Sequence, residues 1–95
     1  MSILVRFQTS NLTKDQYDTV HDALGKSGDW PPPGLLVHAC FGDAQDLRVS
    51  EIWASREQLD AFGETLGPQL QAAGVQVSGE PEFLEVLNVE FFATN

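Results

Sequence analysis

Apolar and polar residues alternate in several short runs, and in two longer segments the apolar residues recur at helical spacing instead. The short runs are rich in β-branched and aromatic residues, which is typical of strands. The first run, "ILVRFQT", begins at Ile3, and the stretch from Gly34 to Ser55 contains two more runs around a turn. The run "FLEVLNVEFF", residues 83–92, predicts a long final strand, and "VQVS", residues 75–78, predicts a short strand before it.

Two capping boxes mark where the helical segments begin. Thr13 is followed three residues later by Gln16, and Ser55 is followed at the same spacing by Gln58. Each box precedes a stripe of residues at intervals of three and four, which is typical of a helix with one buried face. The stripes consist of Tyr17, Val20, His21 and Leu24 in the first segment, and of Leu59, Phe62, Leu66, Leu70 and Ala73 in the second.

Glycine and proline residues predict where these helices end. Gly25, Gly28 and the segment "DWPPPG" end the first helix, and three successive prolines predict an extended loop over residues 30–34. Pro68 removes a backbone donor inside the second segment, so we expect that helix to kink or restart near Gly67. Gly74 is the expected C-cap.

The predicted order of elements is strand, helix, strand, strand, helix, strand. Two right-handed crossovers that share one antiparallel sheet give a ferredoxin-like α+β sandwich, with four strands and both helices on one face of the sheet. A chain of 95 residues suits one small domain, so we assign residues 1–95 to a single domain.

The second predicted strand is apolar on both of its faces. Because two helices cover only one face of a sheet, the other face would be exposed in a monomer. We therefore expect a homodimer in which sheet packs on sheet, with the long final strand reaching the partner. The two faces of the second strand carry Leu35, Val37, Ala39 and Phe41 on one side, and Leu36 and Cys40 beside His38 on the other.

The turn "GDAQD" sets the register of the hairpin. If the turn is closed over two or four residues, the residues that lie opposite each other across the ladder are the same. A three-residue turn would shift the pairing by one position. The pairs expected on one shared face are His38 with Glu51, Leu36 with Trp53, and Cys40 with Val49.

The charge of the chain restricts its partners. Fourteen acidic residues against five basic residues give a formal net charge of −9, which repels nucleic-acid phosphates and anionic membranes. The opening "MSILVRFQTS" does not have a basic lead followed by a long apolar segment, and no later run reaches the roughly 18 apolar residues that span a bilayer. The single Cys40 cannot form an internal disulfide, in agreement with a reducing compartment. We expect a cytoplasmic protein with neither nucleic-acid nor membrane partners.

The run "GLLVHACFGDAQDLRVSEIWASREQLDAFGETLGPQL" and the later "EVLNV" resemble the dimeric α/β-barrel superfamily, especially small bacterial proteins near the antibiotic-biosynthesis monooxygenases. In such barrels the Trp at the end of the third strand looks into a cavity between helices and sheet. Carried over to Trp53, the resemblance implies that His38 and Glu51 line that cavity. Such barrels include cofactor-free oxygenases, polyketide cyclases, haem-degrading enzymes and proteins without known activity, so the resemblance specifies the fold better than the reaction.

The sequence departs from these relatives at three places. Haem-degrading members carry a His about ten residues after the Trp, where this chain has Phe62 and Gly63, so we expect no haem. Quinone-forming oxygenases pair the Trp with an Asn four residues earlier, where Val49 stands. The "HN" of the last strand is replaced by Leu87 and Asn88.

His38 and Glu51 are the candidate catalytic pair, with His38 as a general base and Glu51 orienting its ring. The alternative is a structural polar pair under the helices. Cys40 could complete a metal site with these two residues, but no compact metal motif supports it, and we expect no metal and no cofactor. His21 lies one helical turn from Tyr17 and could face the cavity with it, but we expect it at the surface. Trp30 is expected either as a lid or as a packing anchor. The residues expected to bind a ligand are Trp53, Tyr17, Phe62, Leu36, Cys40 and Asn88.

Two functions remain open. The first is an oxygenase, cyclase or isomerase without a bound cofactor that acts on an aromatic or polyketide-like molecule. The second is a non-catalytic barrel that binds a small hydrophobic ligand or only assembles. The chain lacks a Walker loop, a dinucleotide fingerprint, a serine nucleophile elbow and an HExxH motif. An open cavity of roughly 300 Å³ or more beside His38 would favour the enzyme, and a filled cavity would favour the second function.

Overall fold

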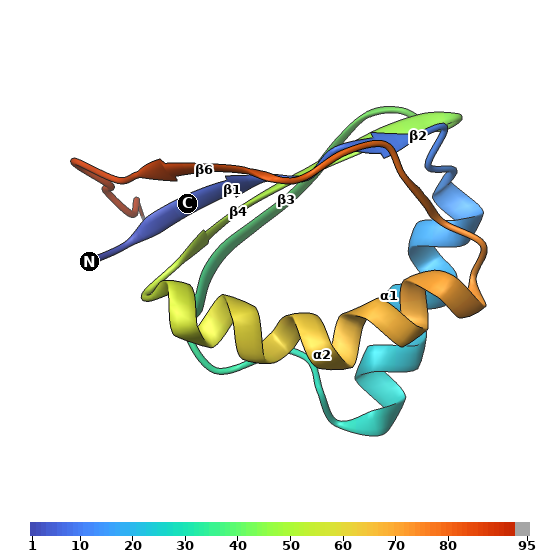
Figure 1. The fold of residues 1–95 in the computed structure, drawn as a ribbon, viewed down its shortest axis with the longest axis horizontal. Helices are drawn as coiled ribbons and strands as arrows, with labels where there is room; N and C mark the ends of the chain where they lie inside the picture. Colours follow the sequence, from blue (N-terminus) through green and yellow to red (C-terminus); the bar gives the residue numbers. More distant parts are fainter. Residues whose placement is uncertain (93–95) are drawn as a thin grey trace.

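A computed structural model describes residues 1–92 of the chain, so the last three residues of the predicted domain lie outside it. Within the described residues the chain folds into two helices and six strands (Figure 1). The elements are β1 (Ile3–Arg6), β2 (Thr9–Ser10), α1 (Lys14–Ser27), β3 (Leu35–Asp43), β4 (Asp46–Trp53), α2 (Arg56–Ala72), β5 (Gln76–Val77) and β6 (Glu82–Glu85).

Four strands form an antiparallel sheet in the order β3-β4-β1-β6, while β2 and β5 pair in a separate two-stranded sheet. Both helices lie on the same side of the larger sheet, whose other face is left without a covering layer (Figure 1). This is the predicted ferredoxin-like α+β sandwich. Neither helix of the described segment has the length and apolar character required to cross a bilayer.

The helix starts agree with the capping signals. Thr13 accepts a hydrogen bond from the backbone of Gln16, whose side chain accepts one from the Thr13 backbone, so the box is complete. At the second start only half of the box forms, because Ser55 accepts from the Gln58 backbone but donates its hydroxyl to the Gln58 side chain. Both helices therefore begin where their N-cap residues satisfy free amide groups.

Of the two outcomes expected near Gly67, a kink or a restart, the restart is wrong. The helix is one element from Arg56 to Ala72 with Pro68 inside it, and the proline removes a single backbone donor. The C-cap is Ala73, one residue before the predicted Gly74. Gly74 follows with a φ of 73°, where the chain leaves the helix in the left-handed conformation. The amide of Gly74 donates to Gln71 and that of Val75 donates to Leu70, which satisfies two terminal carbonyls as in a Schellman motif.

The core lies between the sheet and the two helices. Two of its side chains, Val5 from β1 and Trp53 from β4, are completely buried. The core residues of the two helices belong to the apolar stripes described above. Their side chains pack against those of the strands and exclude water. The buried core cluster is Val5, Val20, Leu24, Trp53, Leu59 and Phe62.

The hairpin has the predicted register over most of its length. Asp43 pairs with Asp46 around a two-residue turn, and His38 lies directly opposite Glu51. The pairing of Leu36 with Trp53 is wrong, because a β-bulge near Leu36 makes Leu35 the partner of Trp53. A bulge inserts one extra residue into a strand, so Leu35 turns toward the core and Leu36 is left 44% exposed.

The final strand is shorter than predicted. β6 covers only Glu82–Glu85. The Val86 amide still donates to the Ser2 carbonyl, but residues 87–92 continue without ladder pairing, although residues 87–91 alternate between apolar and polar. Backbone amides and carbonyls in a single chain pair only where a neighbouring strand is present. In this subunit β1 spans only Ile3–Arg6, so β6 has few residues to pair with. The short strand predicted over residues 75–78 is present as β5.

Gly34 offers a test of the loop that precedes the hairpin. Its φ is 91°, and a Cβ built on it would lie 2.4 Å from the side chain of Gln58. We expect Gly34→Ala to lower the free energy of unfolding by about 2 kcal/mol, from the left-handed backbone and the displaced side chain.

Gly63→Ala is the matched control, since Gly63 is exposed in α2 and a Cβ there meets nothing within 4 Å. It should raise the free energy of unfolding by about 0.5–1 kcal/mol because alanine favours the helix. Urea denaturation followed by circular dichroism measures both changes, and equal stability of the two variants would contradict this account.

Candidate active site

The candidate site begins with a pair of residues on adjacent strands. His38 on β3 and Glu51 on β4 are direct partners in the ladder, so their side chains leave the sheet on the same face. The Nδ1 atom of His38 lies 2.6 Å from Oε2 of Glu51. The sequence therefore predicted this contact correctly from strand alternation and turn length.

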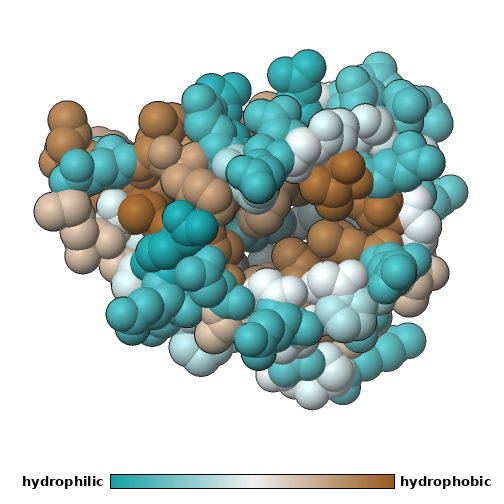
Figure 2. Space-filling model, in the orientation of Figure 1, coloured by the Kyte–Doolittle hydropathy of each residue, from teal (hydrophilic) through white to brown (hydrophobic). Residues whose placement is uncertain are grey.

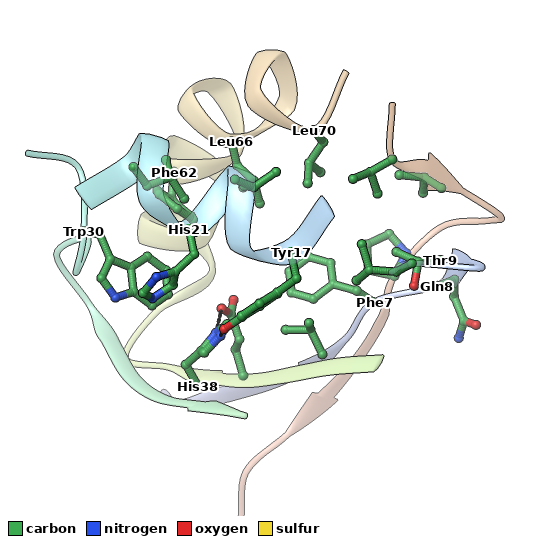
Figure 3. Close-up of a pocket in the computed structure, with 18 residues that line it drawn as sticks. Phe7, Gln8, Thr9, Tyr17, His21, Trp30, His38, Phe62, Leu66 and Leu70 are labelled. Atoms are coloured by element: carbon green, nitrogen blue, oxygen red, sulfur yellow. Dashed lines mark hydrogen bonds and ion pairs between the residues drawn. The ribbon is translucent and has the colours of Figure 1, made fainter. Parts of the chain in front are cut away.

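Two further residues extend the pair into a chain of hydrogen bonds. The hydroxyl of Tyr17, in the first turns of α1, lies 2.6 Å from Nε2 of His38. At the other end, Nε1 of Trp53 donates to Oε1 of Glu51 at 3.0 Å. The order Tyr17, His38, Glu51, Trp53 runs from helix α1 to strands β3 and β4 of the sheet. Figure 3 shows Tyr17 reaching from the helix toward His38.

Burial increases along this chain. The side chain of His38 is 20% exposed and that of Glu51 is 4% exposed, while Trp53 is completely buried. The following assignment of protons satisfies all three hydrogen bonds. The Trp53 indole and His38 Nδ1 donate to the ionised carboxylate of Glu51, and the Tyr17 hydroxyl donates to Nε2 of His38. In this assignment His38 is neutral, and Glu51 holds its ring in a single tautomer and orientation.

Aromatic rings surround the exposed end of the chain. Tyr17 lies between two histidine rings, with centroids 5.7 Å from His21 and 5.9 Å from His38, and it is nearly parallel to both. Trp30, from the proline loop, meets His38 edge-on at 4.9 Å and His21 at 5.2 Å. Phe62 of α2 completes the wall against Trp30 at 6.2 Å. These geometries are the edge-on and offset arrangements that aromatic rings favour.

These groups line one end of a cavity of about 100 Å³ between the helices and the sheet. Trp30 and His21 stand at that end, whereas Phe7, Gln8 and Thr9 lie at the opposite one (Figure 3). The aliphatic part of the lining comes from Leu12, Val20, Leu24, Val49, Leu66, Leu70, Val75, Val77 and Pro81. In the space-filling view the cavity appears as a hollow bordered by apolar surface (Figure 2).

The structure places the predicted ligand-binding residues in different positions. Tyr17 and Phe62 line the cavity together with His38 and Glu51. Trp53 lies behind Glu51 in the core, in contact with the ring of Phe62 at 5.6 Å. Trp53 is thus not part of the cavity lining, contrary to what the resemblance implies, and neither are Leu36, Cys40 and Asn88.

Sequence reasoning placed His21 at the surface, but it is half-buried and lines the cavity. The signal that points to it is its spacing of four residues from Tyr17 on the buried stripe of α1. Trp30 also lines the cavity, and nothing in its local sequence separates a cavity wall from a packing anchor. The placement of both residues depends on how α1 and the proline loop lie over the sheet.

Burial raises the pKa of the Tyr17 phenol, and the charges of Cys40 and Glu51 add to that effect. The Tyr17 hydroxyl is thus a stable donor at neutral pH, in agreement with its hydrogen bond to His38. Burial also raises the pKa of the Cys40 thiol, with a further contribution from Asp18, which makes that thiol a poor nucleophile. No group of three His, Cys, Asp or Glu side chains within residues 1–92 is arranged to hold a metal ion.

Solved structures share this fold over nearly their whole length. A candidate antibiotic biosynthesis monooxygenase from Caulobacter crescentus aligns with a TM-score of 0.60 over 92% of this chain and 89% of its own, at 19% identity. SnoaB, a cofactor-independent oxygenase from Streptomyces nogalater, gives a TM-score of 0.55 over 93% of both chains at 11% identity. A monooxygenase from the gene ActVA-Orf6 of Streptomyces coelicolor, in complex with Nanaomycin D, gives 0.52 over 98% of this chain and 91% of its own at 16% identity.

The chain thus has the ferredoxin-like fold of antibiotic biosynthesis monooxygenase-like proteins. No protein-family model matches the sequence, and no curated protein does. At such low identity the structural likeness establishes the fold, and the chemistry must be argued from the residues of the site.

Tyr17 is the only tyrosine of the chain, which permits a direct test of its environment. Ultraviolet titration of the folded protein should give a phenol pKa above the ordinary value of 10.0, and titration in urea should restore that ordinary value. Between these two values the unfolded chain loses its proton first, so the free energy of unfolding should fall as pH rises above 10. Tyr17→Phe should lack this part of the pH dependence. A folded pKa at or below 10.0 would contradict the buried, donating hydroxyl.

Proposed function

We propose that the protein binds a small neutral aromatic molecule in the cavity and removes a proton from it, with His38 as the base. The observation that carries this proposal is the His38–Glu51 pair, held at 2.6 Å at the wall of an otherwise apolar cavity. A carboxylate that orients a histidine ring and stabilises its protonated form is a common arrangement in general base catalysis. A purely structural pair would not need a cavity beside it.

The lining of the cavity favours a neutral ligand. None of its residues is a lysine or an arginine, so nothing there compensates the charge of a carboxylate or a phosphate. Glu51 adds a negative charge to the lining, and the chain as a whole carries a formal charge of −9. An anionic ligand would be repelled by both. Flat aromatic rings instead match the walls formed by Trp30 and Phe62.

Removal of a proton is the first step of two reactions that need no cofactor. A phenolate or enolate is electron-rich enough to react with dioxygen, and it can also attack a carbonyl group to close a ring. SnoaB, a cofactor-independent oxygenase, has the same fold, which supports oxygenation with dioxygen as the co-substrate. Cyclisation is the alternative reaction of the same activated ligand.

A specific observation favours a second function, which is ligand binding without catalysis. The cavity of about 100 Å³ is smaller than the roughly 300 Å³ that we expected for an enzyme site. A volume near 150 Å³ holds one benzene ring in a well-studied engineered cavity. The space therefore suits a ligand of one ring, and a polyketide of several fused rings would require the helices to move apart.

We also propose a cytoplasmic homodimer, formed by the uncovered face of the sheet. Ladder pairing places Leu4, Val37, Ile52 and Leu84 on the same face as Phe41. Phe41 is 46% exposed and Leu84 is 45% exposed in the single subunit. A second copy presents the same apolar face, so the two sheets would cover each other. Beyond β6, Leu87, Phe91 and Phe92 are also exposed, and an alternating segment without a partner strand suits pairing with a second subunit.

His38→Gln tests the catalytic proposal. With a panel of monocyclic and bicyclic phenols, we expect this variant to bind ligand but to lower dioxygen uptake or cyclisation by about 100-fold or more. Glu51→Gln keeps an acceptor for Trp53 but loosens the histidine, so the rate should fall by about 10-fold. Stopped-flow absorbance and an oxygen electrode measure both effects. If His38→Gln turns over ligand like the wild type but melts several degrees lower, the pair is structural and the protein is not this enzyme.

Sedimentation equilibrium tests the dimer. The wild-type protein at micromolar concentration should have twice the mass of the 10.4 kDa chain. Phe41→Lys should shift it to the monomer because a charge on the buried sheet face is not compensated. Thr19→Lys places the same charge on the exposed side of α1 and should leave the dimer intact. A monomeric wild-type protein would refute the proposal.

A further inference from the structure

Both ring nitrogens of His38 are already bonded within the protein. Nδ1 faces Glu51 Oε2 and Nε2 faces the Tyr17 hydroxyl, each at 2.6 Å. A histidine takes up a proton through a nitrogen lone pair, and the only basic nitrogen of this ring is Nε2, which accepts from Tyr17. A ligand in the cavity therefore does not reach the base directly while this arrangement is kept.

His38 also lines the cavity, but the Tyr17 hydroxyl occupies its Nε2 atom. The Tyr17 side chain lines the cavity and contacts the rings of both His21 and His38. A phenol oxygen that donates its own proton still has lone pairs that accept another. Figure 3 shows the Tyr17 ring reaching from α1 toward His38, so that its oxygen lies next to the histidine ring.

We propose that Tyr17 is the catalytic residue that touches the ligand and passes the ligand's hydroxyl proton to His38. This inference rests on the proposed function, because it requires His38 to act as the base. The ligand O–H bond breaks as a new O–H bond forms on Tyr17, while the original Tyr17 O–H bond breaks as an N–H bond forms at Nε2. The products are a bound phenolate or enolate, a neutral Tyr17 and a protonated His38 beside the Glu51 carboxylate.

The relay restricts the class of ligand. The group that accepts the ligand's proton is the Tyr17 oxygen, which lies at hydrogen-bond distance from Nε2 of His38. The proton therefore comes from a phenol or enol hydroxyl, which can form a hydrogen bond to that oxygen, and not from a C–H group. The raised pKa of the Tyr17 phenol fits this role, since a free tyrosinate would be too unstable there to persist as the resting base. Glu51 then stabilises the imidazolium at the far side of the ring.

4-Nitrophenol is a suitable probe, since it has a single ring, is mainly neutral in mildly acidic solution, and absorbs at a longer wavelength as its phenolate. Bound to the wild-type protein at such a pH, it should show at least about a threefold larger phenolate fraction than the free probe, equivalent to half a pKa unit. Tyr17→Phe removes only the hydroxyl and should lower the phenolate fraction of the bound probe to the value in water or below it, because burial by itself raises the pKa of a phenol. Thr19→Val removes a hydroxyl from the exposed side of the same helix and should leave the fraction at the wild-type value.

His38→Gln and the double variant separate the relay from the proposed function. If the two residues form one pathway, His38→Gln should lower the phenolate fraction as far as Tyr17→Phe does, and the double variant should lower it no further. If His38→Gln lowers the fraction and Tyr17→Phe does not, the relay is wrong and the base is still His38. If the wild-type protein does not bind the probe, or binds it without raising the phenolate fraction, the proposed function fails and the relay fails with it.

Discussion

The buried carboxylate of Glu51 is the constraint on which the rest of the site depends. A carboxylate that is 4% exposed costs several kcal/mol if it lacks hydrogen-bond donors. Its two oxygens are satisfied by His38 across the ladder and by Trp53, two residues further along the same strand. These three residues share a sheet face because strand side chains alternate. The register of one hairpin therefore determines the polar centre of the molecule.

The position of Tyr17 depends on how α1 is attached to that hairpin. The amide of Lys14 donates to Ala44 in the hairpin turn, and the amide of Leu47 donates back to Leu12. The capping box of Thr13 fixes the direction in which the helix leaves this anchor. The Tyr17 hydroxyl, one turn further on, then reaches Nε2 of His38. A short segment of backbone contacts thus places the fourth member of the hydrogen-bond chain.

The larger sheet has an apolar region on each of its two faces. On the helix side lies the cavity, with His38 at its wall. On the other side lies the face that carries Phe41 and Leu84. Because these regions are on opposite sides of one sheet, a second subunit on the open face would leave the cavity accessible to a ligand. Strand alternation allows the two faces of one sheet to differ in this way.

Much of the fold, and half of the site, follow from local sequence signals. The capping boxes at Thr13 and Ser55 locate the helices, and the two-residue turn brings His38 opposite Glu51. These features could be predicted because they depend on residues that are close in sequence or paired by a short turn. The left-handed Gly74 just beyond the C-cap of α2 has the same local cause.

Only the tertiary structure decided the remaining features. The bulge that turns Leu36 outward follows from the packing of Leu35 on the core, and β6 ends early because its partner strand β1 is short. His21 and Trp30 face the cavity because α1 and the proline loop settle over the sheet in one particular orientation. Such placements depend on contacts between segments far apart in the sequence, and neither strand alternation nor capping determines how one layer lies upon another.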